Sequence, residues 1–258
     1  MHRRKGPFVT KKAIECSQKG RVAVVRLDAE SFVEDCFADT SYALSDFCAE
    51  ISSKEDVCVF AILMNAKKSF TEGKIGDAWE STGVPSPVDC ISALQIPVII
   101  GMDGYVLGED LELALACDVR VAAPESYFGF PGIHKGYVPS QGGTQRLPRL
   151  VGKGMALEMI LTGAVIDVNT SQRIGLVSRI AKGEKLNSEV MNMATEMSQK
   201  SPISLRYSKE AINKGMDLTL EQGIRLEADL YYLMHTTRDR SEGIRAFQEK
   251  RPPEFKGT

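Results

Sequence analysis

The stretch Gly101–Asp118 constrains the fold more than any other part of the sequence. It begins at the end of an apolar strand, turns through glycines and enters a short helix that is almost entirely apolar. One carboxylate, Glu112, stands in that helix between Leu111 and Leu113. A strand, a glycine turn and a helix start present backbone N–H groups at the positive end of the helix dipole. The stretch therefore predicts anion-stabilising backbone beside a buried proton carrier.

Composition excludes several classes of protein. The chain has 258 residues, of which 43% are hydrophobic and 26% charged, as in an ordinary soluble globular protein. Its net charge is −2, with 32 basic and 34 acidic side chains, so no global field favours nucleic acid or an anionic membrane. No apolar run approaches the roughly 20 residues of a membrane helix, and no signal-peptide pattern follows the basic N-terminus. We therefore expect a cytoplasmic protein with neither nucleic acid nor membrane as a partner.

Cysteine and histidine spacing argues against a metal centre. The six cysteines are widely spread without a CxxC pair, and the three histidines complete no metal-ligand spacing with them. Reduced, mostly buried thiols are the simpler interpretation. We expect no metal.

The hydrophobic pattern divides the chain into two regions. Up to residue 183, short strands alternate with helices, and the strand–strand–helix order indicates stacked ββα layers. From residue 184 to 258 the pattern is entirely helical, and its apolar stripes are typical of core packing or subunit contact. The predicted strands are 13–16, 21–27, 57–64, 97–102 and 118–123, and the predicted helices include 40–52, 86–94, 144–150, 153–161 and 239–249.

Three segments carry the residue types of a catalytic site. Ser69–Asp77 and Gly101–Asp118 each place glycine-flanked backbone after a strand, so that two N–H groups can converge on one oxygen. Such a pair stabilises an oxyanion, often the largest single contribution to catalysis. Tyr127–Leu147 contains a glycine- and proline-rich segment, long for a compact domain, of the kind that often carries function.

Several motifs in the same order resemble the crotonase (enoyl-CoA hydratase/isomerase) superfamily over nearly the whole chain. They lie at residues 104–108, 112–118, 142–152, 161–163 and 242–256. The resemblance implies the α/β crotonase (ClpP-like) fold, a spiral of ββα units over residues 1–183 with a C-terminal helical trimerisation region over 184–258. It also implies homotrimers, commonly paired as hexamers. The implied substrate is an acyl-CoA thioester, in which coenzyme A belongs to the substrate, with no separate cofactor.

The resemblance assigns roles to individual residues. The two oxyanion N–H groups fall on Lys74 and Glu109, and the first of the hydratases' two catalytic glutamates falls on Glu112. The place of the second glutamate holds Gly132, so one carboxylate is absent. The positions that the resemblance assigns to substrate or CoA binding are Phe70, Gly73, Lys74, Ile75, Gly108 and Lys250.

The missing carboxylate leaves several reactions open. Enoyl-CoA hydration is the first expectation, because the chain-wide similarity is closest to hydratases. Isomerisation of an enoyl or dienoyl thioester needs only one shuttling carboxylate and comes next; decarboxylation and thioester hydrolysis stand further back. The alternative of a different class is a catalytically weak member that serves as a binding or assembly subunit.

Two features of the sequence bear on the absent proton carrier. His134, two residues after Gly132, is a stand-in because histidine titrates near neutral pH, although a plain loop histidine fits the position as well. Glu109 and Asp110 replace glycines at the oxyanion position. If these two side chains point outward, they favour the helix N-terminus; if they point inward, they supply the missing acid.

Overall fold

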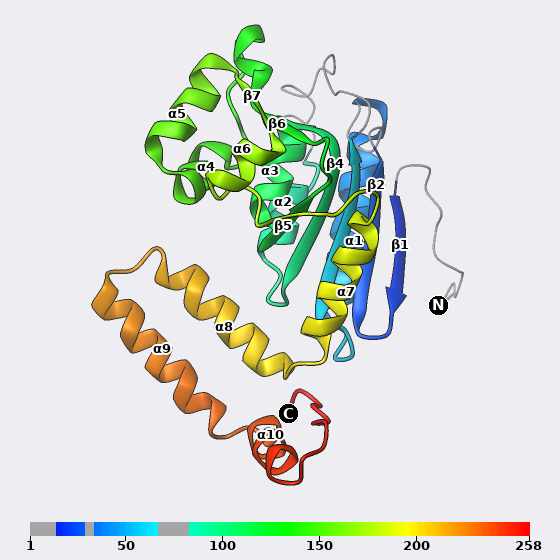
Figure 1. The fold of residues 1–258 in the computed structure, drawn as a ribbon, viewed down its shortest axis with the longest axis vertical. Helices are drawn as coiled ribbons and strands as arrows, with labels where there is room; N and C mark the ends of the chain where they lie inside the picture. Colours follow the sequence, from blue (N-terminus) through cyan, green and yellow to red (C-terminus); the bar gives the residue numbers. More distant parts are fainter. Residues whose placement is uncertain (1–13, 29–33, 67–82) are drawn as a thin grey trace.

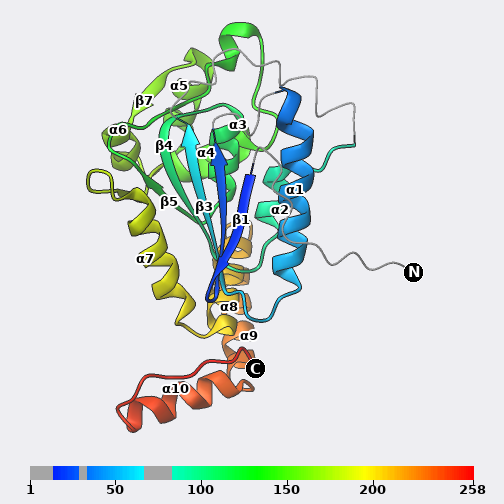
Figure 2. The same cartoon turned by 90° about the vertical axis from the view of Figure 1, so that its right-hand side faces the viewer.

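The computed structural model describes residues 14–28, 34–66 and 83–258. A mixed sheet forms the centre, with α1, α2 and α3 on one side and α7 on the other (Figures 1 and 2). The strands are β1 (Ile14–Lys19), β2 (Val22–Asp28), β3 (Val59–Ala66), β4 (Val98–Leu107), β5 (Val119–Ala122), β6 (Tyr127–Gly129), β7 (Val165–Asp167) and β8 (Arg179–Ile180). The helices are α1 (Glu34–Ser52), α2 (Pro87–Ser92), α3 (Glu109–Ala116), the 3₁₀ helix η1 (Pro131–Lys135), α4 (Gly143–Val151), α5 (Lys153–Thr162), α6 (Val168–Arg173), α7 (Leu186–Ser198), α8 (Pro202–Gly215), α9 (Leu220–Met234) and α10 (Arg238–Gln248).

The sheet has the order β1-β2-β3-β4-β5-β8, and β6 and β7 branch from the far end of β4. The first two strands form the predicted antiparallel hairpin, while β2, β3, β4, β5 and β8 run parallel. Parallel neighbours need helices on both faces, which explains the continuous apolar run in β3. Val59 and Phe60, adjacent in sequence, are both fully buried, one on each face of the sheet.

Within Gly101–Asp118, the structure differs from the sequence prediction in where the strand ends. The strand predicted to end near residue 102 continues to Leu107. Two glycines do not end it, because its neighbours continue to pair with it: Gly104 pairs with Ala66 of β3, and Tyr105 pairs with Tyr127 of β6. The turn into α3 therefore contains Gly108 alone.

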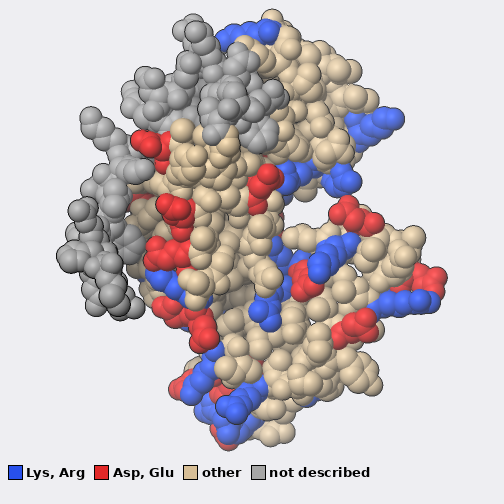
Figure 3. Space-filling model, turned by 180° about the vertical axis from the view of Figure 1, so that it is seen from behind, with Lys and Arg blue, Asp and Glu red and all other residues tan. Residues whose placement is uncertain are grey.

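The C-terminal region is helical, as its pattern predicts, and α8, α9 and α10 each begin after a capping side chain. Ser201 caps α8 and is followed by proline at the first turn, and Thr219 forms a capping box with Gln222 at the start of α9. Thr237 caps α10 by accepting a hydrogen bond from the Arg240 N–H. From behind, α8 and α9 stand away from the central sheet across a hollow, with side chains of both charges distributed over that face (Figure 3).

The C-terminal region predicted to begin at residue 184 includes α7, which packs against the sheet as part of the core. Leu186, Val190 and Ala194 of α7 are buried against the sheet with residues of β2, β3 and β4. Only α8, α9 and α10 project from the core (Figure 2). The division of labour between residues 1–183 and 184–258 stays a prediction.

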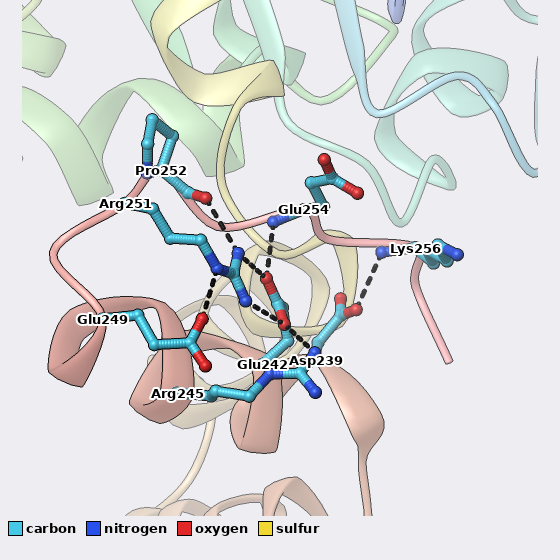
Figure 4. Close-up of polar contacts among 8 residues, drawn as sticks. All are labelled: Asp239, Glu242, Arg245, Glu249, Arg251, Pro252, Glu254 and Lys256. Atoms are coloured by element: carbon cyan, nitrogen blue, oxygen red, sulfur yellow. Dashed lines mark hydrogen bonds and ion pairs between the residues drawn. The ribbon is translucent and has the colours of Figure 1, made fainter.

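The last residues of the chain fold back onto α10 (Figure 4). Glu242 accepts hydrogen bonds from the Arg251 guanidinium at 2.6 Å and from the Glu254 N–H at 3.0 Å, and these interactions hold the pKa of its carboxyl far below the usual range. Asp239 accepts from the Lys256 N–H at 2.8 Å and from the Ser201 hydroxyl at 2.8 Å. The tail therefore joins α10 to the start of α8.

One ion pair attaches the projecting helices to the sheet. Lys209 of α8 lies 2.7 Å from the Asp118 carboxylate and donates to the Ile96 carbonyl at 2.9 Å. The same oxygen of Asp118 accepts from the N–H of Val98, the first residue of β4. The side chains of Lys209 and Asp118 are only 11% and 24% exposed, so this pair is shielded from solvent more than the other ion pairs between described side chains.

We predict that Lys209→Met destabilises the protein by roughly 3 kcal/mol, because it leaves the Asp118 carboxylate largely buried without its cation. Urea denaturation measures the loss. Lys214→Met is the matched control on the same helix, since Lys214 is 64% exposed and pairs with Glu210 one turn away. Such a surface pair contributes about 0.5 kcal/mol or less. Equal costs for the two substitutions would contradict the anchoring role.

Candidate active site

Glu112 lies one turn into α3 and is 2% exposed. Its Oε1 accepts two backbone hydrogen bonds, from the Gln141 N–H at 2.8 Å and from the Gly143 N–H at 2.7 Å. Both donors lie in the turn that opens α4, about thirty residues further along the chain. The carboxylate is therefore held by its oxygen rather than left to rotate.

Close approach explains why residue 143 is glycine. A Cβ at Gly143 would lie 2.9 Å from Glu112 Oε1 and 2.9 Å from Pro139 Cβ, closer than a real Cβ approaches its neighbours. The Arg146 guanidinium donates to the Gln141 carbonyl at 2.8 Å and fixes the same turn from the outside. The turn is shaped around the carboxylate oxygen.

The protonation of Glu112 is set by opposing effects. Burial raises the pKa of its carboxyl, while the N–H groups of Gly143, Gln141 and Ser140 and the charge of Arg146 lower it. Burial has the larger effect, so the pKa lies above its ordinary value. A carboxyl that is partly stabilised in both forms is suited to taking up and releasing a proton.

The start of α3 supplies backbone suited to an oxyanion. Gly108 has φ 55° and ψ −118°, a combination that favours glycine, and its N–H donates to the Gly129 carbonyl at 3.0 Å. Glu109 is the first helical residue, so its N–H has no acceptor within the helix and lies at the positive end of the dipole. The other predicted donor, Lys74, and the predicted binding residues Phe70, Gly73 and Ile75 lie outside the described residues.

Glu109 and Asp110 are both withdrawn from solvent to a large extent. Burial, with the nearby charges of Glu112 and Asp110, raises the pKa of Glu109 to about 8. Burial alone raises the pKa of Asp110 to about 7. The Oε2 atom of Glu109 is buried and has no hydrogen-bond partner among the described residues. Glu109 is thus not the solvated charge that the outward alternative requires.

Gly132 and His134 lie in η1, which follows β6. A Cβ at Gly132 would lie 3.4 Å from Tyr137 Cβ and 4.0 Å from the Tyr137 carbonyl oxygen, which are ordinary contacts, so a Cβ fits there. His134 is exposed, and its imidazole packs on Gly163 at the end of α5, where a Cβ would lie 2.5 Å from Nε2. In the described part of the chain, no hydrogen bond joins His134 to Glu112.

The remaining predicted positions lie apart from α3. Lys250 follows α10, which lies far from α3 (Figure 1), so one chain does not bring it to Glu112. Within the described ranges, no group of histidine, cysteine and carboxylate side chains is arranged to hold a metal ion, and the cysteines Cys16, Cys48, Cys58, Cys90 and Cys117 are free. No helix in these ranges is long and apolar enough to span a bilayer.

Sequence reasoning missed the groups that hold Glu112. The Gln141 and Gly143 N–H groups are backbone donors, which no side-chain pattern reveals. The paired glycines Gly142 and Gly143 before a helix were the available signal. Their meaning depends on which distant carboxylate the turn meets.

Comparisons with known proteins place the chain in a family. The family model described as enoyl-CoA hydratase/isomerase matches residues 57–258, so the chain belongs to that family, and its fold is the crotonase fold. It is 34% identical over 245 residues to the crotonyl-CoA hydratase of Syntrophomonas wolfei, covering 91% of this chain and 94% of that protein. It is also 34% identical over 251 residues to a probable mitochondrial enoyl-CoA hydratase of Dictyostelium discoideum, covering 92% and 88%. The crystal structure of an enoyl-CoA hydratase from Bacillus anthracis superposes with a TM-score of 0.82 at 30% identity, covering 95% of this chain and 99% of that one.

The raised pKa of Glu109 predicts a pH-dependent stability. Folding raises this pKa from 4.5 to about 8, so the folded state retains a proton that the unfolded chain releases between these values. The free energy of unfolding therefore falls as pH rises through that window. We expect Glu109→Gln to reduce this fall by on the order of 4 kcal/mol between pH 5 and pH 8.5.

Denaturation at several pH values measures this effect. Asp110→Asn is the comparison, because the Asp110 pKa rises only to about 7 and its contribution is complete at lower pH. An unchanged pH dependence in Glu109→Gln would show that Glu109 is ionised in the folded protein at neutral pH.

Proposed function

We propose that this chain is an enoyl-CoA hydratase, which adds water across the conjugated double bond of a 2-enoyl-CoA thioester. The observation that carries the proposal is Glu112, buried and held through Oε1 by the Gln141 and Gly143 N–H groups in a member of this family. Coenzyme A enters as part of the substrate, and the proposal includes no separate cofactor.

In this reaction Glu112 acts as the base. Its carboxylate takes a proton from water as the water oxygen bonds to the β-carbon, and the electrons of the double bond move onto the thioester oxygen. The Glu109 N–H, with the Lys74 N–H implied by family resemblance, stabilises the resulting enolate. A proton then adds to the α-carbon and restores the thioester. The net change is the addition of one water.

The same proposal extends to the remaining predicted positions. Substrate binding would involve Phe70, Gly73, Lys74, Ile75 and Gly108. Lys250 would take part only from another copy of the chain, because it lies apart from α3 within one chain. His134 would assist proton transfer only after moving from its present contact with Gly163. The cytoplasmic location expected from the sequence stays a prediction.

Double-bond isomerisation is the second candidate, and Gly132 favours it. With a single glutamate at the two family positions, Glu112 can remove a proton from the γ-carbon and return it to the α-carbon. Decarboxylation and thioester hydrolysis rank below these two reactions as candidates. A purely binding role would predict no turnover of any of these thioesters.

We predict that crotonyl-CoA gains one water in the presence of the protein and that Glu112→Gln lowers kcat by about 10²- to 10⁴-fold, since it removes the proton acceptor. Mass spectrometry of the products measures the gain. Incubation of 2- and 3-enoyl thioesters in heavy water separates hydration from isomerisation, because isomerisation incorporates deuterium without adding water.

Glu158→Gln, an exposed position on α5, is the control and should retain the wild-type rate. Full activity in Glu112→Gln would remove Glu112 from the mechanism. Absence of any reaction across the panel would contradict the enzymatic proposal.

The projecting helices support a proposal of self-assembly. Large apolar side chains face solvent along α8, α9 and α10 in one chain, and monomeric proteins rarely expose so many together. We propose a homotrimer, or a dimer of trimers, formed through this region. The side chains more than half exposed are Ile212, Met216, Leu220, Ile224, Tyr231, Tyr232 and Phe247.

We predict that Leu220→Glu combined with Phe247→Glu converts the assembly to monomers or dissociates it at micromolar concentration, because each side chain is more than 80% exposed in the single chain. Light scattering coupled to size-exclusion chromatography measures the mass. Tyr42→Glu on α1 is the control for adding charge at an exposed apolar position. A wild-type protein that is monomeric would overturn the proposal.

A further inference from the structure

Hydration requires two proton transfers, one from water and one to the α-carbon. The family site uses two glutamates for them, and Gly132 provides no side chain at the second place. Glu112 alone would have to take the water proton and then deliver a proton elsewhere on the substrate. A second acid near Glu112 would remove that difficulty.

Glu109 has the position that this role needs. It precedes Glu112 by three residues on α3, and residues at that spacing are neighbours on one side of a helix. The effect of the Glu112 charge on its carboxyl agrees with this proximity. Its backbone N–H is at the predicted oxyanion position. The Glu109 side chain therefore branches from the backbone next to the place where the thioester oxygen would bind.

The environment of Glu109 favours the protonated carboxyl. Oε2 is buried without a hydrogen-bond partner among the described residues, an arrangement that is costly for a charged oxygen. The charged neighbours on its own helix, Asp110 and Glu112, are both acidic. Arg146 of α4 acts on Glu112 and is not among the groups that affect Glu109. A protonated carboxyl whose oxygen has no hydrogen-bond partner can donate its proton to a substrate atom.

We propose that Glu109 supplies the second carboxyl group of this site and donates a proton to the α-carbon of the substrate, while Glu112 accepts the proton of the attacking water. This inference rests on the proposed hydratase function. The proposal accounts for the absence of a carboxylate at Gly132, because the second carboxyl comes from α3 rather than from η1.

The step balances in atoms and charge. The water O–H bond breaks and its proton binds Glu112, while the water oxygen bonds to the β-carbon. The Glu109 O–H bond breaks and its proton bonds to the α-carbon. Glu109 is left as a carboxylate and Glu112 as a carboxyl, and transfer of one proton between them, directly or through solvent, restores the starting state.

The test begins with Glu109→Gln, which keeps the backbone N–H and the size of the side chain. We expect kcat for crotonyl-CoA hydration to fall at least about 100-fold. We also expect wild-type activity to decline above pH 8, where the donor loses its proton, and this decline to disappear in the variant. Glu158→Gln, at an exposed position on α5, is the control, which should keep both the rate within threefold and the alkaline decline.

Rescue distinguishes chemistry from structure. In Glu109→Gln combined with Gly132→Glu, the new carboxyl is introduced at the family position, where the added Cβ makes only ordinary contacts. We expect kcat of this double variant to be at least tenfold higher than kcat of Glu109→Gln alone. If Glu109→Gln does not fold, Glu109→Asp replaces it, and an acid shortened by one methylene should lower kcat while keeping an alkaline decline.

The outcomes separate this inference from the proposed function. Hydration by the wild type with an unchanged rate and pH profile in Glu109→Gln overturns the role of Glu109 and leaves the hydratase proposal intact. A slow Glu109→Gln variant that keeps the wild-type alkaline decline also overturns it, because the loss is then structural. Failure of the wild type to hydrate any enoyl thioester overturns the hydratase function itself.

Discussion

Two backbone N–H groups on one carboxylate oxygen connect the parts of this site. Gln141 and Gly143 donate to Glu112 Oε1, and they belong to a turn that the chain reaches only after β5, β6 and η1. Hydrogen bonds to a charged group contribute about 1.5–3 kcal/mol each, enough to offset part of the cost of burying the carboxylate. Without them, Glu112 would be a destabilising charge in an apolar helix. With them, it fixes α3 against α4.

The central sheet determines where that helix lies. β4 pairs with β3 and β5 through its first half and with β6 through its second, so it passes from the main sheet into the smaller one. At its beginning, the Val98 N–H shares Asp118 with Lys209 of α8. At its end, Gly108 turns the chain into α3. One strand therefore joins the attachment of the projecting helices to the site.

Local patterns predicted much of the fold and the burial of Glu112. Continuous apolar runs predicted the buried strands, helical apolar stripes predicted the C-terminal helices, and a lone carboxylate between leucines singled out Glu112. Gly104 made β4 look shorter than it is, because the pairing that carries it onward depends on β6, a strand distant in sequence. The direction of the Glu109 side chain could not be predicted either, since burial at a helix start depends on what packs over it. Lys74 and its neighbours lie outside the described residues, so their predicted roles stay predictions.

The absence of a side chain at Gly143 has a consequence for the stereochemistry of the product. Because the turn approaches Glu112 so closely, Oε1 is fixed to the backbone and the carboxylate cannot turn to offer its two oxygens in alternation. In the proposed hydration, a base held in one orientation activates water from one direction only. The hydroxyl group then enters one face of the double bond, and the 3-hydroxyacyl product is a single stereoisomer. The close approach at Gly143 thus contributes to the fixed geometry on which the handedness of the new carbon centre depends.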